Sequence, residues 1–211
     1  MADFVALGFE LAFKYRNPAI ILADGIIGQM MEKVVLPEQR PRLTNEEVMA
    51  RCPWATFGKL KHRGPNIVTS LELDPAEMEK RNIHLQQKYA EIEEKEVRYE
   101  EIHCDDAEYL IVAFGSCARI AQKAMEEARA EGIKVGLLRP ITLWPFPSKA
   151  IAERSRQVKG ILTVELNAGQ MVEDVRLAVE CKVPVEYFGR LGGIVPDPDE
   201  VVTALKEKII K

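Results

Sequence analysis

The second half of the chain alternates short apolar runs with amphipathic segments, and this alternation limits the folds that it can adopt. Apolar runs lie at 108–115, 134–140, 160–167 and 183–189, and helix-like segments at 117–130, 148–158, 170–180 and 198–210. Runs this apolar predict strands buried on both faces, whereas the alternating run at 97–102 predicts an edge strand. Strand–helix alternation of this kind is typical of βαβ units. We therefore expect an α/β fold with a doubly wound, mostly parallel sheet over residues 97–211.

The first 36 residues indicate a much smaller unit. An apolar helical face runs from Phe4 to Ala12, the helix ends before Pro18, and the apolar run at 19–24 predicts a fully buried strand. One helix and one strand cannot enclose a core, so this strand needs neighbours from another segment or subunit. We predict that residues 1–36 expose apolar surface in the isolated chain, and that self-association covers it.

Residues 37–96 read as a linker with one acidic helix. Prolines and glycines interrupt residues 37–70 without sustained periodicity. Asp74 then fits an N-cap, with Pro75 at the first helical position and Glu77 completing a capping box. Residues 72–108 hold thirteen acidic and five basic side chains. This charge favours a solvated helix, and an acidic docking face for a basic partner is the alternative.

Composition excludes several classes of function. The net charge of −4 and the pI of about 5.6 argue against a nucleic-acid partner. No signal peptide precedes the first helix, and no apolar stretch reaches the ~20 residues that span a bilayer, so we expect a cytoplasmic protein without a membrane partner. The cysteines, at positions 52, 104, 117 and 181, form no CxxC. They and the histidines lack metal-ligand spacing, so we expect no metal or iron–sulfur site on this chain.

The loops at the carboxyl ends of parallel strands are where such sheets bind ligands. Gly115 and Ser116 open a helix whose free N–H groups could hold an anion, with Arg119 nearby; the alternative is that Ser116 is only the N-cap. The GRLGG string at 189–193 adds backbone freedom and one cation, Arg190, which suits close approach of another chain or of a phosphate. Ser116, Arg119 and Arg190 are thus the candidate cofactor-binding residues.

The string RPITLWPFP at 139–147 predicts a rigid, extended loop, because proline fixes φ and excludes helix. The loop could plug its own core with Trp144 and Phe146. Equally, it could present both as a contact surface that loses little entropy on binding.

The string VELNAGQM at 164–171 places Glu165 in an apolar strand, and a buried carboxylate requires a partner. Arg139 and Arg190 are the candidates, and structural pairing is favoured over a general acid or base. No GxSxG, HExxH, P-loop or Cys–His pair is present, so we assign no catalytic residue. The candidate interface residues are Trp144, Phe146, Asn167, Gln170 and Arg190.

Five strings occur in an order that resembles 2-oxoacid:ferredoxin oxidoreductases: DGIIGQMMEKVVLP (24–37), FGSCAR (114–119), RPITLWPFP, VELNAGQM and GRLGG. The chain is most similar to the α-subunit of the 2-ketoisovalerate (3-methyl-2-oxobutanoate) and 2-oxoglutarate types. By this resemblance, residues 1–36 are the tail end of the thiamine pyrimidine-binding domain. Residues 37–96 are a linker, and residues 97–211 are a transketolase C-terminal-like domain.

The resemblance implies oxidative decarboxylation of a 2-oxoacid with coenzyme A, giving an acyl-CoA, CO2 and reduced ferredoxin. The family complex uses thiamine diphosphate, magnesium and iron–sulfur clusters, and the implied partners are thiamine-binding β, γ and ferredoxin-like subunits. We expect none of these cofactors on this chain alone. A family α-subunit would start about 150 residues earlier, by the size of one α/β domain. We therefore expect a fragment, a split subunit or a decayed relative that is inactive by itself.

Three functions follow. The chain could be the C-terminal portion of an oxidoreductase subunit, serving assembly and inter-domain contact. It could be a non-catalytic α/β interaction module derived from that enzyme. It could also be a phosphate- or coenzyme A-binding domain that uses the helix start at 115–119.

Overall fold

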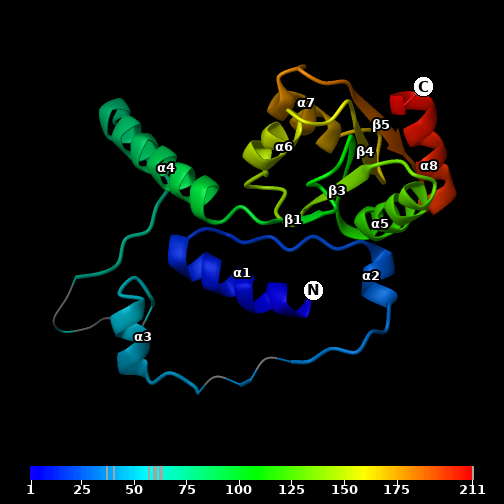
Figure 1. Ribbon diagram of the computed structural model, residues 1–211. Helices are drawn as coiled ribbons and strands as arrows, with labels where there is room; N and C mark the ends of the chain where they lie inside the picture. The colour runs from blue at the N-terminus through cyan, green and yellow to red at the C-terminus, as the bar shows by residue number, and fades with distance from the viewer. Residues whose placement is uncertain (37, 40, 57, 59–60, 62–63, 211) are drawn as a thin grey trace. The chain divides into compact units, whose positions relative to one another are not determined.

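The computed structural model describes residues 1–36, 38–39, 41–56, 58, 61 and 64–210. The chain forms two compact units (Figure 1). The N-terminal unit comprises Met1–Leu22 and Met30–Lys88, and the α/β unit comprises Ala23–Gln29 and Tyr89–Lys211. The α/β unit is therefore not continuous in sequence, because a short segment from the N-terminal region belongs to it.

The α/β unit is built on a five-stranded sheet of order β1-β3-β2-β4-β5. The strands are β1 (Tyr99–Ile102), β2 (Tyr109–Ala113), β3 (Val135–Pro140), β4 (Ile161–Glu165) and β5 (Val185–Gly189). The pairs β2–β3, β2–β4 and β4–β5 are parallel, and β1 lies antiparallel to β3 at one edge. The predicted mostly parallel sheet and its edge strand at 97–102 are thus confirmed.

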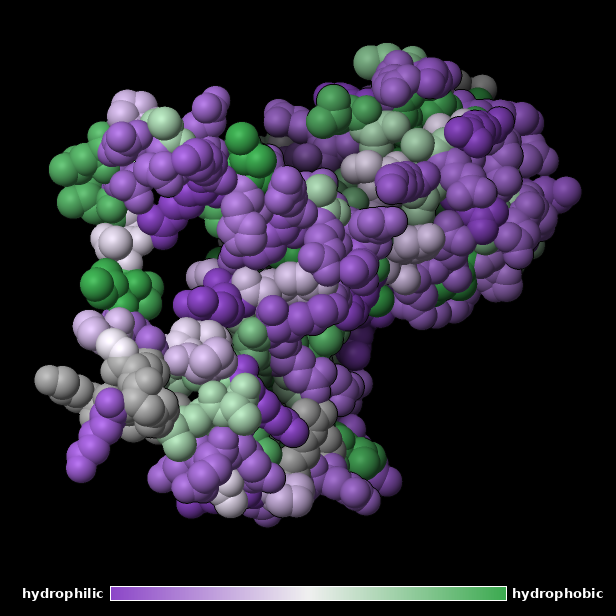
Figure 2. All heavy atoms as spheres, turned by 90° about the vertical axis from the view of Figure 1, so that its left-hand side faces the viewer, coloured by the Kyte–Doolittle hydropathy of each residue, from purple (hydrophilic) through white to green (hydrophobic). Residues whose placement is uncertain are grey.

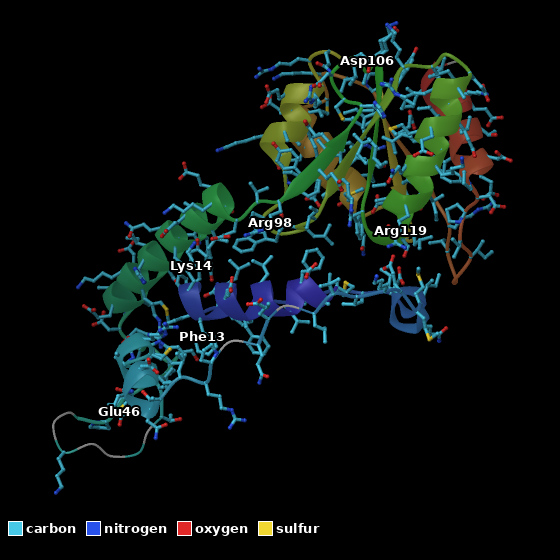
Figure 3. The ribbon with its side chains drawn as sticks, turned by 60° about the horizontal axis from the view of Figure 1, so that its bottom comes forward. Phe13, Lys14, Glu46, Arg98, Asp106 and Arg119 are labelled. Carbon is cyan, nitrogen blue, oxygen red and sulfur yellow. The ribbon has the colours of Figure 1, made fainter. Side chains whose placement is uncertain are left out.

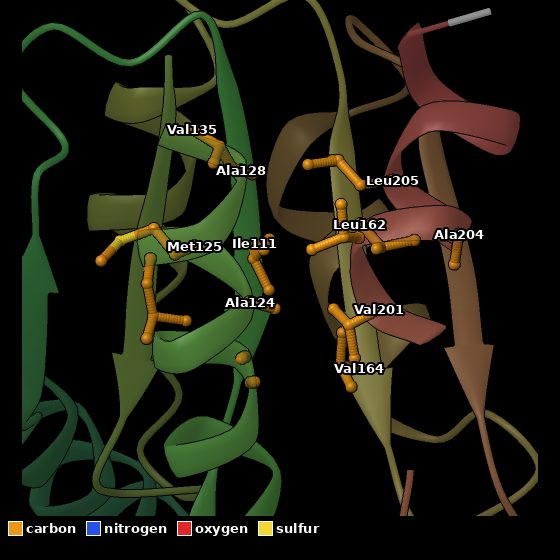
Figure 4. Close-up of a cluster of buried hydrophobic side chains, with 14 of the residues drawn as sticks. Ile111, Ala124, Met125, Ala128, Val135, Leu162, Val164, Val201, Ala204 and Leu205 are labelled. Atoms are coloured by element: carbon orange, nitrogen blue, oxygen red, sulfur yellow. The ribbon is translucent and has the colours of Figure 1, made fainter. Parts of the chain in front are cut away.

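Helices cover both faces of this sheet, as in a doubly wound fold. The apolar cluster on one face is shared by α5 (Gly115–Ala130) and α8 (Pro198–Leu205), and the cluster on the other face by α6 (Ser148–Arg154) and α7 (Met171–Val179). Figure 4 shows the first cluster, where Ile111, Leu162 and Leu205 are fully buried. Burying each such side chain contributes roughly 1.5–3 kcal/mol. The predicted α/β fold class is therefore confirmed.

The predicted helices at 117–130 and 198–210 differ from the observed elements at their ends. The first begins at Gly115 and follows directly on β2. The second is α-helical only over Pro198–Leu205 and continues as a π-helical turn over Lys206–Ile210. Its start is fixed by a capping box between Asp197 and Glu200.

The N-terminal unit contains α1 (Ala2–Tyr15), α3 (Asn45–Arg51) and most of α4 (Pro75–Lys95), whose last turns belong to the α/β unit. The strand predicted at 19–24 is wrong, because this segment is neither strand nor helix. Ile20 is 81% exposed and Leu22 is 70% exposed. An apolar run becomes a buried strand only beside partner strands, and the described part of the chain supplies none here. Pro37, at the predicted linker boundary, lies outside the described residues.

Apolar side chains are indeed exposed on residues 1–36, as predicted. On α1, Val5, Phe9 and Phe13 follow one another at four-residue steps and are 50%, 66% and 55% exposed. This spacing places them along one face of the helix. Figure 2 shows hydrophobic side chains on a mostly hydrophilic surface of the molecule. The predicted self-association remains to be measured.

The start of α4 matches two of its sequence signals, the Asp74 N-cap and the proline at the first helical position. One carboxylate oxygen of Asp74 accepts hydrogen bonds from the N–H groups of Ala76 at 2.8 Å and Glu77 at 3.2 Å. Asp74 therefore caps the helix, as predicted. Within α4 only Ile92 is buried, which agrees with the interpretation of a solvated acidic helix.

Candidate functional site

The start of α5 lies at the carboxyl end of β2, where the sheet presents its ligand-binding edge. Phe114 is the N-cap and Gly115 adopts a positive φ of 57°, so Ser116 lies inside the first turn. The alternative in which Ser116 is the N-cap is therefore wrong. Its hydroxyl instead donates a 2.5 Å hydrogen bond to a carboxylate oxygen of Asp24.

Asp24 comes from the segment 23–29, which belongs to the α/β unit although it lies far upstream in sequence. Its other carboxylate oxygen accepts a 2.7 Å hydrogen bond from the N–H of Ile27, at the short helix α2 (Gly25–Gln29). The Ser116 bond, followed by the Ile27 bond, lowers the pKa of Asp24 below its usual value. A negative charge thus stands at the start of α5. Arg119 lies one turn further on and is exposed (Figure 3).

The corresponding helix start after β4 is occupied by Glu165, whose side chain is fully buried. Its carboxylate accepts hydrogen bonds from the backbone N–H groups of Gln170 at 3.2 Å, Met171 at 2.8 Å and Val172 at 3.0 Å. These are among the N–H groups that a helix leaves unpaired at its N-terminus, where the dipole also favours an anion. Glu165 is therefore the anionic cap of α7.

Neither arginine that we considered is the partner of Glu165. Arg139 donates to Glu100 on β1 at 3.0 Å, and Arg190 donates to Glu200 on α8. The expected structural pairing exists, but backbone N–H groups supply it. The sequence pattern pointed to charged side chains because it does not reveal which backbone donors will face a strand end.

Arg190 connects the loop after β5 to α8. The second carboxylate oxygen of Glu200 accepts from the N–H of Asp197 at 3.1 Å, so Arg190 binds the capping box of that helix. The Arg190 side chain is 39% exposed, yet its Nε is buried and has no hydrogen-bond partner among the described residues. Gly192 and Gly193 adopt positive φ of 67° and 86°, so the GRLGG loop uses the backbone freedom that its composition indicated.

Asn167 and Gln170 shape the turn between β4 and α7. The side-chain oxygen of Asn167 accepts from the N–H of Gly169 at 2.7 Å, and its carbonyl accepts from the Tyr187 hydroxyl. Gln170 is the exposed N-cap residue of α7. Burial, with the charge of Glu165, raises the pKa of Tyr187. Sequence reasoning missed Tyr187. It follows Glu186 in a predicted strand and belongs to no recognisable motif.

The loop at 139–147 gives its two aromatic side chains different roles. Phe146 is partly buried and packs against the apolar cluster beneath α6 and α7. Trp144 is 55% exposed, and its ring meets the ring of Tyr89 edge-on at a centroid distance of 5.9 Å. Within the loop, Thr142 donates to the Pro145 carbonyl at 2.7 Å. Phe146 therefore fills the core, as one of our two interpretations predicted, whereas Trp144 is exposed and its role as a contact surface stays a prediction.

The parallel strands bring the loops carrying Ser116, Trp144, Gln170 and Arg190 to one edge of the sheet. At this edge the chain's own carboxylates, from Asp24 and Glu165, stand at the starts of α5 and α7. A phosphate group needs free N–H donors or unneutralised cations there. At α7 the N–H groups are already bonded to Glu165, and at α5 the Asp24 carboxylate would repel a second anion. These helix starts therefore do not fit the phosphate groups of thiamine diphosphate or coenzyme A, and we derive no step through either.

Among the described residues, no group of three or more His, Cys, Asp or Glu side chains is arranged to hold a metal ion. In the same part of the chain, no helix combines the length and the apolar character that crossing a bilayer requires.

The chain is similar in sequence to several known proteins. Residues 107–201 match the family model of pyruvate:ferredoxin oxidoreductase core domain II. The chain is 46% identical to the ketoisovalerate oxidoreductase subunit VorB of Methanothermobacter thermautotrophicus, over 98% of this chain and 57% of that protein. It is 31% identical to the 2-oxoglutarate synthase subunit KorA of Archaeoglobus fulgidus, over 90% of this chain and 53% of that protein.

A solved structure shows the same fold. It is the 2-oxoglutarate:ferredoxin oxidoreductase from Magnetococcus marinus, which aligns with a TM-score of 0.58 at 24% identity, over 65% of this chain and 24% of that chain. The chain spans little more than half the length of the curated relatives that it matches. Along nearly its whole length, the chain is therefore similar to part of the subunits of 2-oxoacid:ferredoxin oxidoreductases, and residues 107–201 are similar to core domain II of pyruvate:ferredoxin oxidoreductase.

Proposed function

We propose that this chain is the C-terminal portion of the α-subunit of a 2-oxoacid:ferredoxin oxidoreductase and that it acts on a branched-chain 2-oxoacid as part of the complete enzyme. The reaction is the oxidative decarboxylation of 3-methyl-2-oxobutanoate with coenzyme A, giving 2-methylpropanoyl-CoA, CO2 and reduced ferredoxin. Thiamine diphosphate, magnesium and iron–sulfur clusters supply the chemistry from other parts of the complex.

One observation carries this proposal. The identity to the ketoisovalerate oxidoreductase subunit is 46%, against 28–31% to the 2-oxoglutarate synthase subunits that match most of the chain. The difference extends over nearly the whole chain, so it favours the ketoisovalerate type over the 2-oxoglutarate type.

We further propose that residues 1–36 are the tail end of a pyrimidine-binding domain, residues 37–96 a linker, and residues 97–211 the transketolase C-terminal-like domain. The exposed apolar side chains of α1 and of residues 19–22 support the first assignment, because such surface is stable only when another element covers it.

The α/β unit serves assembly in this proposal. At its carboxyl edge, the carboxylates of Asp24 and Glu165 stand at the starts of α5 and α7. At the same edge, Trp144 is 55% exposed, and Leu191 and Ile194 are each 58% exposed. Exposed aromatic and aliphatic side chains on a rigid scaffold are the groups that contribute most to protein interfaces. Asn167 and Arg190 already bind within the chain, and Phe146 packs against the core. Trp144 and Gln170 are therefore the stronger candidates for contact with other subunits.

The test is affinity capture of the tagged chain from its own source cell, followed by mass spectrometry and an assay of the captured complex. We expect a thiamine-binding subunit and a ferredoxin-like subunit to be recovered. The complex should reduce an artificial electron acceptor when coenzyme A and 3-methyl-2-oxobutanoate are added, and more slowly with 2-oxoglutarate.

A matched pair of variants localises the contact. Trp144→Ala should lower recovery of the other subunits about tenfold, in line with loss of a buried aromatic anchor. Leu177→Ala removes a side chain on α7 that is 78% exposed and should leave recovery unchanged. Recovery of the chain alone, with no 2-oxoacid oxidation, would support the non-catalytic α/β module instead.

A further inference from the structure

The segment 23–29 gives the chain an unusual path between its two units. The chain leaves the N-terminal unit after Leu22, returns to it at Met30, and crosses again between Lys88 and Tyr89. The segment between the first two crossings has little to bury: α2 has no buried residue, and Ile26 is 44% exposed. Apolar packing therefore does not explain why these residues stay on the α/β unit.

The Asp24 carboxylate makes polar contacts both within the segment and to α5. Asp24 shapes its own turn, because its side chain accepts from the N–H of Ile27 at 2.7 Å and its carbonyl accepts from the N–H of Gly28 at 3.2 Å. The remaining carboxylate oxygen accepts the 2.5 Å bond from the Ser116 hydroxyl on α5. Asp24 thus joins a preformed turn to the start of a sixteen-residue helix.

The start of α5 is well suited to an anion from elsewhere in the chain. The helix has no side-chain hydrogen bond at its own cap, Phe114, and no acidic residue in its first turn. Its unpaired N–H groups and its dipole favour a negative charge. Burial foremost, followed by the charges of Glu165 and Asp24, raises the pKa of the Cys117 thiol in this turn to about 11.

We propose that Asp24 is a docking residue that fastens the segment 23–29 to the first turn of α5 and thereby tethers α1 to the α/β unit. With the segment docked, only residues 16–22 connect the end of α1 to that unit. With the segment released, the shortest covalent connection is residues 16–88. The end of α1 is then held at the second crossing noncovalently, by hydrogen bonds from Lys88 to the Tyr15 carbonyl at 3.3 Å and to the Asn17 side chain at 2.5 Å. A shorter tether raises the effective concentration of one unit at the other. This role does not depend on which 2-oxoacid the complete enzyme uses.

Hydrogen–deuterium exchange on the whole chain tests the docking. Ser116→Ala removes the bond between the two elements and leaves the Asp24 turn intact. We expect amides in residues 25–29 to exchange about tenfold faster in this variant, because a hydrogen bond to a charged group is lost. Asp24→Asn and Asp24→Ala should accelerate the same amides at least as much. Asp74→Asn, the same change at the cap of α4, is the matched control and should not affect them.

Retained protection of β2, β3 and β4 shows that each variant is folded. Unchanged exchange of residues 25–29 in both Ser116→Ala and Asp24→Ala would overturn the docking.

A second readout tests the tether. Fluorescent dyes at positions 6 and 208 of a chain lacking Cys52 and Cys181 should report a broader distance distribution after Asp24→Ala. An equal width in the two chains would overturn the tether, even if exchange had accelerated.

Discussion

The carboxylate of Glu165 accepts a 2.8 Å hydrogen bond from the backbone N–H of Met171, and it does so as a fully buried group. Replacing Glu165 by alanine leaves three N–H groups of α7 without this acceptor. We expect the free energy of unfolding to fall by about 3 kcal/mol, measured by urea denaturation.

Glutamine at position 165 keeps the shape but loses the charge, and it turns an NH2 group toward donors. Glu165→Gln should therefore lower the free energy of unfolding by about as much as Glu165→Ala. Glu173→Gln, in the exposed first turn of the same helix, is the control and should change stability by less than about 0.5 kcal/mol. Equal effects at the two positions would show that Glu165 is not the cap of α7.

The Arg129–Asp106 pair predicts a loss of stability in acid. The hydrogen bond from Arg129, 2.5 Å to one Asp106 oxygen, lowers the pKa of Asp106, and that from Lys159 lowers the pKa of Glu108. A pKa that is lower in the folded state stabilises the protein above the unfolded value, near 4. This stabilisation is lost as pH falls through the folded values.

Urea midpoints of the parent chain, measured from pH 5 downward, should therefore decline below about pH 4. The midpoints of the Asp106→Asn variant should decline less steeply. The difference should shrink in 1 M salt, because the pair is partly exposed and is screened. Identical slopes for the two proteins would contradict the assignment.

The cysteines should differ sharply in reactivity. Burial, helped by Glu101 at Cys104 and by Glu165 at Cys117, raises the pKa of both thiols to about 11, and each side chain is 3% exposed. At pH 8 roughly one such thiol in a thousand is ionised, whereas Cys181 is exposed. Iodoacetamide should label Cys181 first and reach Cys104 and Cys117 only in denaturant, as peptide mass spectrometry would show.

The apolar face of α1 predicts concentration-dependent self-association of the isolated chain. Phe9 is 66% exposed beside Val5 and Phe13, and Phe9→Lys should shift the sedimentation-velocity profile toward monomer. Leu177→Lys places the same charge on α7, at a site that is 78% exposed, and should leave the sedimentation profile unchanged. A parent chain that sediments as a monomer at all concentrations would remove the basis of this expectation.

The fold of the α/β unit could be predicted because its strands are buried on both faces, so that runs such as 108–115 and 160–167 stand out against the helices between them. The N-terminal strand at 19–24 could not be predicted correctly. Its apolar composition is the same, but strand formation depends on neighbours that the run itself does not encode.

For the candidate site, the sequence predicted which loops lie at the carboxyl edge of the sheet, and the function of that edge stays a prediction. The carboxyl-edge loops were identified correctly, yet the partners of Glu165 and Ser116 were not. The partners of Glu165 are backbone N–H groups, which a sequence pattern does not reveal. The partner of Ser116 is a carboxylate from a segment that we had assigned to a different domain. We interpreted the Asp-Gly at 24–25 as the end of a strand. The same dipeptide is typical of turns, and the Asp24 side chain does accept a hydrogen bond from a backbone N–H in such a turn.

The bond between Asp24 and Ser116 also bears on the order of folding, because 92 positions separate the two residues. Closing a loop of that length costs roughly 4 kcal/mol of chain entropy before any contact offsets it. The pairing of β2 with β3 and β4 closes shorter loops and buries far more apolar surface. The segment 23–29 is synthesised before the sheet and α5 but can dock only after they have formed. Its docking is therefore a late step in folding that follows the formation of the α/β unit.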